Sequence, residues 1–144
     1  MGEVIQQSIT LHAEPNKIWR ALTSRRDLSQ WWSEGVVIEP EIGGLFKEPW
    51  VDSEGIPQLA TGKVLEARKD EELKFTWHEK DWPVEWETEC SIKIEDQGEE
   101  RVLTVTHEGW EHLPEEKRGN YIKDFEVGWQ LHLKELKSYV DLSP

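Results

Sequence analysis

Two histidines near the end of a strand-like segment have the residue types of a zinc site but not its spacing. His107 and Glu108 begin like the H-E-x-x-H motif of zinc proteases, but the second histidine, His112, follows five residues later instead of four. Gly109, at the expected exit of a strand, also argues against the helix that would bring both imidazoles to one face. The sequence therefore predicts no metal site here. A strand-end histidine followed by a turn is the better interpretation.

A covalent mechanism finds no support in the sequence either. Cys90 is the single cysteine and lies on the apolar side of an alternating segment, where a thiol is usually inert. No G-x-S-x-G nucleophile motif occurs, and the pair Gly43-Gly44 lacks the flanking Lys and Ser/Thr of a phosphate-binding loop. We therefore predict no catalytic residue, no cofactor and no turnover carried by His107, His112 or Cys90.

Acid–base chemistry needs only one carboxylate or histidine with a shifted pKa inside a pocket, so it leaves no sequence motif. The groups that the alternation allows to face inward are His107, His132, Glu48, Asp52 and Glu66. A structural role is the preferred interpretation for each of them. His132 follows Trp129 by three residues on the apolar side of a helical segment, which favours a histidine in a pocket wall over a catalytic one.

A long helix at the end of the chain is the clearest of the elements that would position these groups. Apolar side chains recur there every three to four residues, the spacing of one helix face, at Tyr121, Phe125, Trp129, Leu133, Leu136 and Val140. Pro114 precedes this pattern. We predict a helix from about Glu115 to about Val140.

Short helices and alternating strands make up the rest of the chain. The expected order is a strand over Ile5–Leu11, a helix from Pro15, a second helix from Ser24 toward Gln30, and strands over 36–39, 45–47, 58–67, 73–78, 86–94 and 101–107. One helix must then cover one face of one sheet. We predict an α+β fold and a single domain over residues 1–144. A curved antiparallel sheet of about six or seven strands wraps around the C-terminal helix, with two short helices after the first strand.

The composition argues against several classes of partner. Thirty acidic residues against seventeen basic ones give a net charge of −13, which repels nucleic acid and anionic lipid surfaces. No stretch has the length and hydrophobicity of a membrane span, and the N-terminus lacks the pattern of a signal peptide. A lone cysteine forms no disulfide within the chain, which suits a reducing cytosol. We expect a cytoplasmic protein that binds neither nucleic acid nor membrane.

Tryptophan is enriched, with nine Trp beside three Phe and two Tyr. Large aromatic side chains are the usual lining of small-molecule sites. We predict that the side chains on the inward side of their elements border one continuous cavity, and these are Trp32, Phe46, Trp77, Trp86, His107, Phe125, Trp129 and His132.

The chain as a whole resembles the family of activator of heat shock protein 90 ATPase homologues, within the START-like, helix-grip (SRPBCC) superfamily. The resemblance extends from Ile5 to Val140. The segments that carry it are Ile18–Thr23, Leu28 with Trp31-Trp32, Gly62–Glu66, Leu73–Trp77, Leu103–His107 with Gly109-Trp110, and Gly128-Trp129 with Leu133 and Leu136. It implies a helix-grip fold in which an antiparallel sheet and the C-terminal helix enclose a hydrophobic cavity.

The resemblance also frames the expected function. Members of the superfamily serve as co-chaperone modules, as binders of lipids or aromatic metabolites and, in related families, as cyclases. Our hypothesis is that this protein is a non-enzymatic binder of a small, largely apolar molecule, a lipid or a flat aromatic metabolite, in a stress-related role that the resemblance alone implies. The alternatives are a module that interacts with a chaperone and an enzyme of the cyclase or dehydratase kind.

Overall fold

The computed structural model describes residues 3–142. Its elements, in chain order, are β1 (Ile5–Leu11), α1 (Pro15–Thr23), α2 (Arg25–Trp31), β2 (Val37–Ile38), β3 (Leu45–Val51), β4 (Pro57–Arg68), β5 (Glu72–Glu79), β6 (Thr88–Asp96), β7 (Arg101–Glu108), the short 3-10 helix η1 (Trp110–His112) and α3 (Glu115–Leu142).

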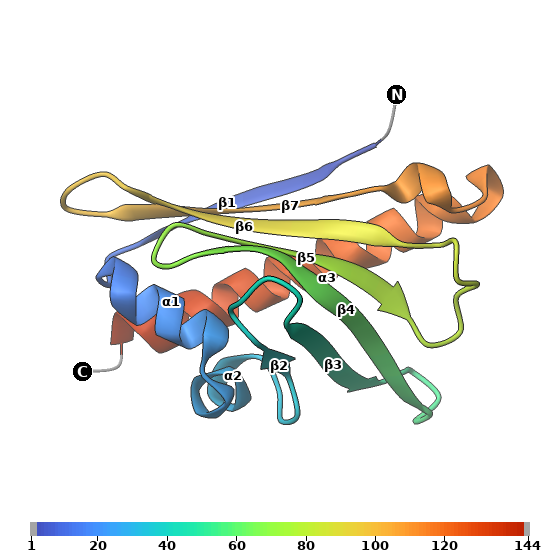
Figure 1. The fold of residues 1–144 in the computed structure, drawn as a ribbon, viewed down its shortest axis with the longest axis horizontal. Coiled ribbons are helices and arrows are strands. Elements are labelled where there is room, and N and C mark those ends of the chain that lie inside the picture. The colour runs from blue at the N-terminus through green and yellow to red at the C-terminus, as the bar shows by residue number, and fades with distance from the viewer. Residues whose placement is uncertain (1–2, 143–144) are drawn as a thin grey trace.

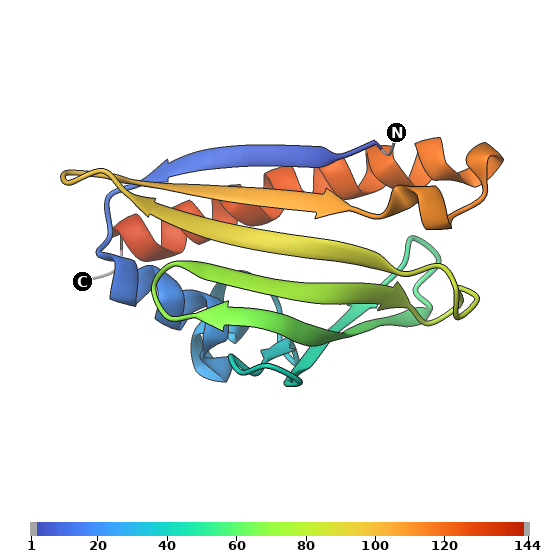
Figure 2. The same cartoon turned by 45° about the horizontal axis from the view of Figure 1, so that its top comes forward.

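The seven strands form one antiparallel sheet in the order β1-β7-β6-β5-β4-β3-β2. Figures 1 and 2 show α3 running along one face of this sheet, with α1 and α2 at the end where α3 finishes. The sheet curves around the helix. The predicted fold class is therefore confirmed: two short helices follow β1, and a long C-terminal helix packs on the sheet. None of the described helices is long and apolar enough to cross a membrane.

The apolar stripe of α3 is buried unevenly along its length. Trp129, Leu133, Leu136 and Val140 are buried in the core, whereas the earlier members of the stripe, at positions 121 and 125, are only half-buried. The C-terminal half of the helix therefore closes the core against the sheet and the short helices. Its N-terminal half leaves aromatic side chains partly uncovered.

β3 and β5 extend beyond the ends that the sequence pattern predicts, and these extensions matter for the cleft. β3 was expected over 45–47 but continues to Val51, through Pro49. Proline interrupts a central strand because it lacks an N–H, but β2 covers only Phe46 and Lys47 of β3, so Pro49 lies where that edge is unpaired. β5 likewise extends one residue past the predicted end, to Glu79. Both extensions add residues that line the cleft described below.

One strand begins later than predicted. The alternation was expected to start at Trp86, but β6 starts at Thr88. The backbone N–H of Trp86 donates to the carbonyl oxygen of Pro83 at 3.0 Å, which closes a turn. Trp86 is half-buried in that turn and packs near Trp82, with 6.3 Å between ring centroids. The turn keeps its N–H out of the sheet, which is why the predicted start was wrong.

Gly62 marks a close approach of two strands. It pairs with Phe46 of β3, and on its other side a Cβ at position 62 would overlap the carbonyl oxygen of Thr76 in β5. The pairing of β4 with β5 shifts between Val64 and Glu66 just beyond it, as in a β-bulge. Only glycine fits this position without movement of the backbone.

We expect Gly62→Ala to lower the free energy of unfolding by about 1–3 kcal/mol, because the added methyl group must push two paired strands apart. Gly119→Ala is the matched control, since Gly119 lies in α3 with open space around its Cβ position and alanine favours helix there. Urea unfolding monitored by tryptophan fluorescence measures both variants. Equal stability of the Gly62→Ala variant and the wild type would contradict the close approach.

Candidate ligand cleft

An open cleft lies between strands β3 and β5 and residues 121–132 of α3. Its volume is about 580 Å³. The side chains that line it are Glu48, Trp50, Val51, Trp77, Glu79, Tyr121, Asp124, Phe125, Gly128, Trp129, Leu131 and His132. Val51 and Leu131 are well exposed and lie at the mouth. A second cavity of about 510 Å³ shares four of these residues and extends toward Trp32 and Glu34.

The structure brings five of the eight side chains predicted to border a cavity to the walls of these two spaces, namely Trp32, Trp77, Phe125, Trp129 and His132. The other three lie elsewhere. Phe46 is fully buried behind Trp77, with 4.8 Å between ring centroids. His107 is fully buried in the core, and Trp86 lies in the turn before β6. The role of the five side chains in binding a ligand stays a prediction.

Glu48 is held in the cleft by tryptophan and histidine. It follows Phe46 on the inner side of β3 and is buried. The indole Nε1–H of Trp32 donates to its Oε2 at 2.7 Å. The Nε2 atom of His132, from α3, lies 3.7 Å from the same oxygen, and its imidazole packs on the Trp32 ring at 4.8 Å between centroids. A carboxyl group and an imidazole thus meet in one aromatic wall.

Glu79 is a second buried carboxyl group, and two indoles hold it. Trp50 donates its Nε1–H to Oε1 at 3.0 Å, and Trp77 donates its Nε1–H to Oε2 at 2.8 Å. The strand register relates the two carboxyl groups. Glu48 pairs with Ala60 of β4, and Ala60 pairs with Glu79 of β5, so all three share one row across the sheet. Two strand spacings separate the backbones of the glutamates by about 10 Å.

Burial shifts the pKa values of this cluster toward uncharged forms. It raises the pKa of Glu48 to about 8, against the opposing effect of the hydrogen bond from Trp32 and with a small further increase from the charge of Glu79. Burial likewise raises the pKa of Glu79 and lowers the pKa of His132 to about 4. At neutral pH the pair of Glu48 and His132 is therefore mostly a protonated carboxyl group beside a neutral imidazole.

His107 lies behind the cleft wall in a chain of hydrogen bonds. Trp129 donates its Nε1–H to the Nδ1 of His107 at 3.1 Å, which fixes the histidine tautomer with its proton on Nε2. That Nε2–H faces the Oγ1 of Thr88 at 2.8 Å, and the Thr88 hydroxyl points to the carbonyl oxygen of Trp77 at 3.5 Å. Burial lowers the pKa of His107 to about 3, so the imidazole is neutral at physiological pH. Its visible role is to anchor Trp129.

The amino-acid sequence matches the family described as Activator of Hsp90 ATPase homolog 1-like protein over residues 12–141. The chain belongs to this family. The seven-strand sheet and the long helix are the SRPBCC-type architecture that the resemblance implied.

Solved structures with low sequence identity share the fold of this family member. A crystal structure of a Mesorhizobium loti protein superposes with a TM-score of 0.79 at 17% identity and covers 99% of both chains. The solution structure of the Aha1 dimer from Colwellia psychrerythraea superposes with a TM-score of 0.76 at 21% identity and covers 96% of both chains. At such identities the likeness establishes the fold alone. No curated protein sequence matches the chain.

Two of the carboxylates allowed to face inward do not reach the cleft of this family member. Asp52 accepts the backbone N–H groups of Glu54 and Ile56, both at 2.9 Å, so it shapes the turn after β3. Glu66 lies beside Arg68, with 3.9 Å between the charged atoms, and both side chains are about half exposed. Cys90 points into the core as predicted, and burial raises the pKa of its thiol.

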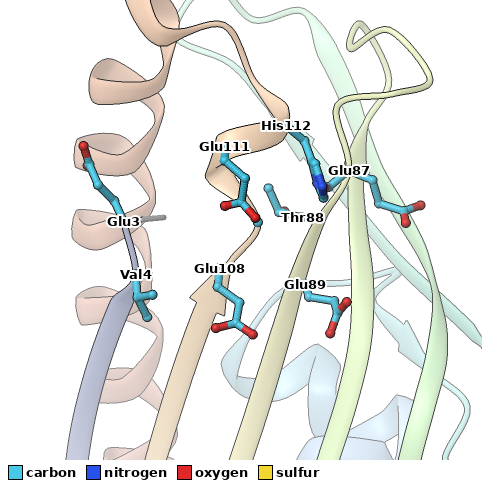
Figure 3. Close-up of a pocket in the computed structure, with 9 residues that line it drawn as sticks. Glu3, Val4, Glu87, Thr88, Glu89, Glu108, Glu111 and His112 are labelled. Atoms are coloured by element: carbon cyan, nitrogen blue, oxygen red, sulfur yellow. The ribbon is translucent and has the colours of Figure 1, made fainter. Parts of the chain in front are cut away.

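An acidic groove of about 340 Å³ lies apart from the cleft, at the ends of β6 and β7. Figure 3 shows the carboxylates of Glu3 and Glu87 at opposite sides of this groove. The Nδ1–H of His112 donates to the backbone carbonyl of Glu87 at 2.6 Å, whereas His107 points into the core, so the two histidines do not meet. Among residues 3–142 no three His, Cys, Asp or Glu side chains are grouped to hold a metal ion.

Sequence reasoning missed several residues of the cleft. Glu79 follows Leu73, Phe75 and Trp77 on the same side of β5, so one further step of the alternation would have found it. Trp50 continues the side of β3 that carries Glu48, but Pro49 ended the predicted strand too early. The rim residues at positions 124 and 131 had no signal, because only the distance between α3 and β3 makes them part of a wall, whereas Tyr121 belonged to the predicted apolar stripe of the helix.

Proposed function

We propose that this protein binds a small molecule with a largely apolar body, a lipid or a flat aromatic metabolite, in the cleft between β3, β5 and α3, without turning it over. The observation that supports the proposal is a cavity of about 580 Å³ with aromatic walls and an open mouth. Its size lies within the range of ligand sites, about 300–1,000 Å³. A stress-related role follows from the family resemblance and belongs to the proposal in that sense only.

The expected affinity for a neutral apolar ligand is modest. Burial of about 300–400 Å² of its apolar surface contributes roughly 7 to 10 kcal/mol. Association costs at least about 4 kcal/mol of this in lost freedom of motion. The remainder corresponds to a dissociation constant between tens of micromolar and millimolar, roughly. Tighter binding requires polar groups of the cleft to recognise polar groups of the ligand.

Gly128 offers a direct test of the cleft. It lines the cavity from α3, and a Cβ at this position would meet no atom within 4 Å. We expect Gly128→Leu to fill the cleft and to weaken binding of the neutral fluorescent probe N-phenyl-1-naphthylamine at least tenfold, with no loss of stability. Titration of the probe, followed by its emission and by tryptophan quenching, measures the affinity.

The matched control is Gly119→Leu, which introduces the same side chain in α3, again into open space, at a residue that does not line the cleft. We expect it to bind the probe as the wild type does. The proposal fails if the wild type shows no saturable binding below millimolar probe, or if both leucine variants bind equally well.

A co-chaperone-type interaction module is the second candidate function. The observation that favours it is the exposure of Val51 and Leu131 at the cleft mouth, beside Trp50, which is 40% exposed. Exposed apolar side chains that lie together are typical of protein contacts. A purified chaperone of the Hsp90 type that binds the wild type but not a Val51→Ser, Leu131→Ser double variant would favour this function over small-molecule binding.

A further inference from the structure

The carboxyl groups of the cleft have no cationic partner at neutral pH among the described lining residues, because burial lowers the pKa of His132, the imidazole beside Glu48, to about 4. Glu48 and Glu79 lie in the walls, and Asp124 and Glu34 lie exposed along the rims of the two connected cavities. None of the described residues that line either cavity is Lys or Arg. A buried carboxylate without a positive partner is costly, so ionisation of Glu48 or Glu79 favours any ligand that brings a cation.

The hydrogen bonds to these carboxyl groups orient them without cancelling their charge. All three donors are indole N–H groups, from Trp32, Trp50 and Trp77. An indole N–H is neutral, unlike the guanidinium or ammonium group that usually accompanies a buried carboxylate. The two carboxyl groups are thus fixed in position, and none of these donors cancels the negative charge that either group carries once it ionises.

The aromatic walls favour the same kind of ligand. The rings of Trp77 and Trp129 lie at 65° to each other with 5.9 Å between centroids, and Phe125 packs edge-on to Trp77 at 5.5 Å. Faces of Trp and Phe attract ammonium groups through their π electrons, and they also bury the apolar part of a ligand. An anionic ligand, such as a fatty acid, would meet no Lys or Arg among the described lining residues, and Glu48 or Glu79 would repel it once ionised.

We propose that the ligand of this cleft is an organic cation, in which an ammonium group is joined to an apolar body. The ammonium group lies near Glu48 and Glu79, and the body lies against Trp77, Phe125 and Trp129. The inference rests on the proposed function, because it assigns a ligand class to the same cleft. Glu48 and Glu79 line the same cavity, so one ammonium head can lie near both carboxyl groups.

A pair of probes of nearly equal shape tests the charge. Benzyltrimethylammonium carries the cation, and neopentylbenzene replaces its nitrogen with carbon. We expect the cation to bind the wild type at least tenfold more tightly than the neutral probe at pH 8.5, by calorimetry or tryptophan fluorescence. This comparison uses the unaltered protein, so it does not depend on the folding of any variant.

Substitutions locate the recognition. Glu48→Gln keeps an oxygen acceptor for the N–H of Trp32, whereas Glu79→Gln keeps one for only one of its two indole donors. We expect each to weaken binding of the cation at least fivefold while binding of neopentylbenzene stays unchanged. Glu99→Gln alters the net charge equally in the exposed hairpin between β6 and β7, and we expect no effect on either probe.

The pH dependence gives a separate reading, because a quaternary ammonium does not titrate. The titratable side chains that line the two cavities together with Glu48 are His132 and Asp124 of α3, Tyr121 of α3, Glu79 of β5 and Glu34 beyond α2, and of these His132 lies 3.7 Å from the Glu48 carboxyl group. With its pKa at about 8, Glu48 is ionised in only about 3% of the protein at pH 6.5 and is mostly ionised at pH 9. Affinity for the cation should therefore rise up to roughly 30-fold over this range.

The outcomes separate this inference from the proposed function. Equal binding of both probes, or tighter binding of 4-phenylbutanoate than of the cation, would overturn the organic-cation inference and leave an apolar cleft. Binding of neither probe below millimolar concentration would overturn the small-molecule proposal and this inference with it. Preference for the cation that survives both Gln substitutions would place the charge recognition elsewhere and refute the role of Glu48 and Glu79.

Discussion

We expect the free energy of unfolding of the wild type to fall as the pH rises from 6.5 to 9, and we expect Glu48→Gln to remove most of this fall. Burial raises the pKa of Glu48 from 4.5 to about 8. Between these values the folded protein keeps a proton that the unfolded chain has released, so the free energy of unfolding falls as the pH rises. The contribution is fully present below pH 4.5. Its loss amounts to about 2 kcal/mol between pH 6.5 and 9 and roughly 4 to 5 kcal/mol in all.

Urea unfolding at pH 6.5, 8 and 9 measures this difference, with wild type, Glu48→Gln and Glu99→Gln compared at each pH. Glutamine still accepts the N–H of Trp32 but cannot ionise. The free energy of unfolding of Glu48→Gln should therefore not show the fall of about 2 kcal/mol between pH 6.5 and 9. Glu99→Gln, which removes an exposed carboxylate, should follow the wild type. Parallel curves for the wild type and Glu48→Gln would show that Glu48 is ionised in the folded protein at neutral pH and would contradict the raised pKa.

Replacement of His107 by glutamine should have its largest effect near neutral pH and a smaller one in acid. At pH 7 the variant loses the packing of the imidazole on Trp110, 4.7 Å between centroids, and part of the hydrogen-bond chain to Trp129 and Thr88. We expect a loss of about 2–4 kcal/mol. In acid the free energy of unfolding of the wild type also falls, because burial lowers the pKa of His107 from 6.5 to about 3. Stability from this group is present above pH 6.5 and is lost as the pH falls toward 3.

The two unfolding curves should therefore approach each other in acid. Between pH 7 and 4.5 the wild type loses about 2–3 kcal/mol through His107 alone, and the His107→Gln variant does not. His132 loses stability in the same direction in both proteins, because its pKa is lowered to about 4. His12→Gln, at an exposed histidine, serves as the control. A constant difference between wild type and His107→Gln across this range would contradict a neutral, buried imidazole.

The pattern of the sequence was sufficient for the fold but only for part of the cleft. Alternation and helical spacing report which side of an element is buried, so they placed Cys90 inward and predicted the α3 stripe. They do not report how far two elements stand apart. Phe46 and His107 lie on the inward side of their strands as predicted, but they pack beneath other rings instead of facing the open space.

The ends of strands limited the prediction of the carboxyl groups. Glu48 was among the candidates to face inward although it lies one residue beyond the expected strand 45–47, whereas Glu79, one residue beyond the expected end of β5, was not. Its partners Trp50 and Trp77 come from different strands, and the register that unites them is a property of the whole sheet. No local pattern contains that information.

The indole hydrogen bonds also determine how the cleft can respond to an occupant. Trp32, Trp50, Trp77 and Trp129 each have their N–H bonded to a fixed acceptor, so rotation of any of these rings breaks a hydrogen bond. Phe125 has no such polar tether and is only half-buried. The walls that these indoles form are therefore preorganised and lose little conformational entropy on binding, whereas the part of the wall formed by Phe125 can adapt. We therefore expect the cleft to discriminate strongly between ligands of different width, which the fixed indole rings limit. We expect it to discriminate weakly between ligands of different length, to which the wall at Phe125 can adjust.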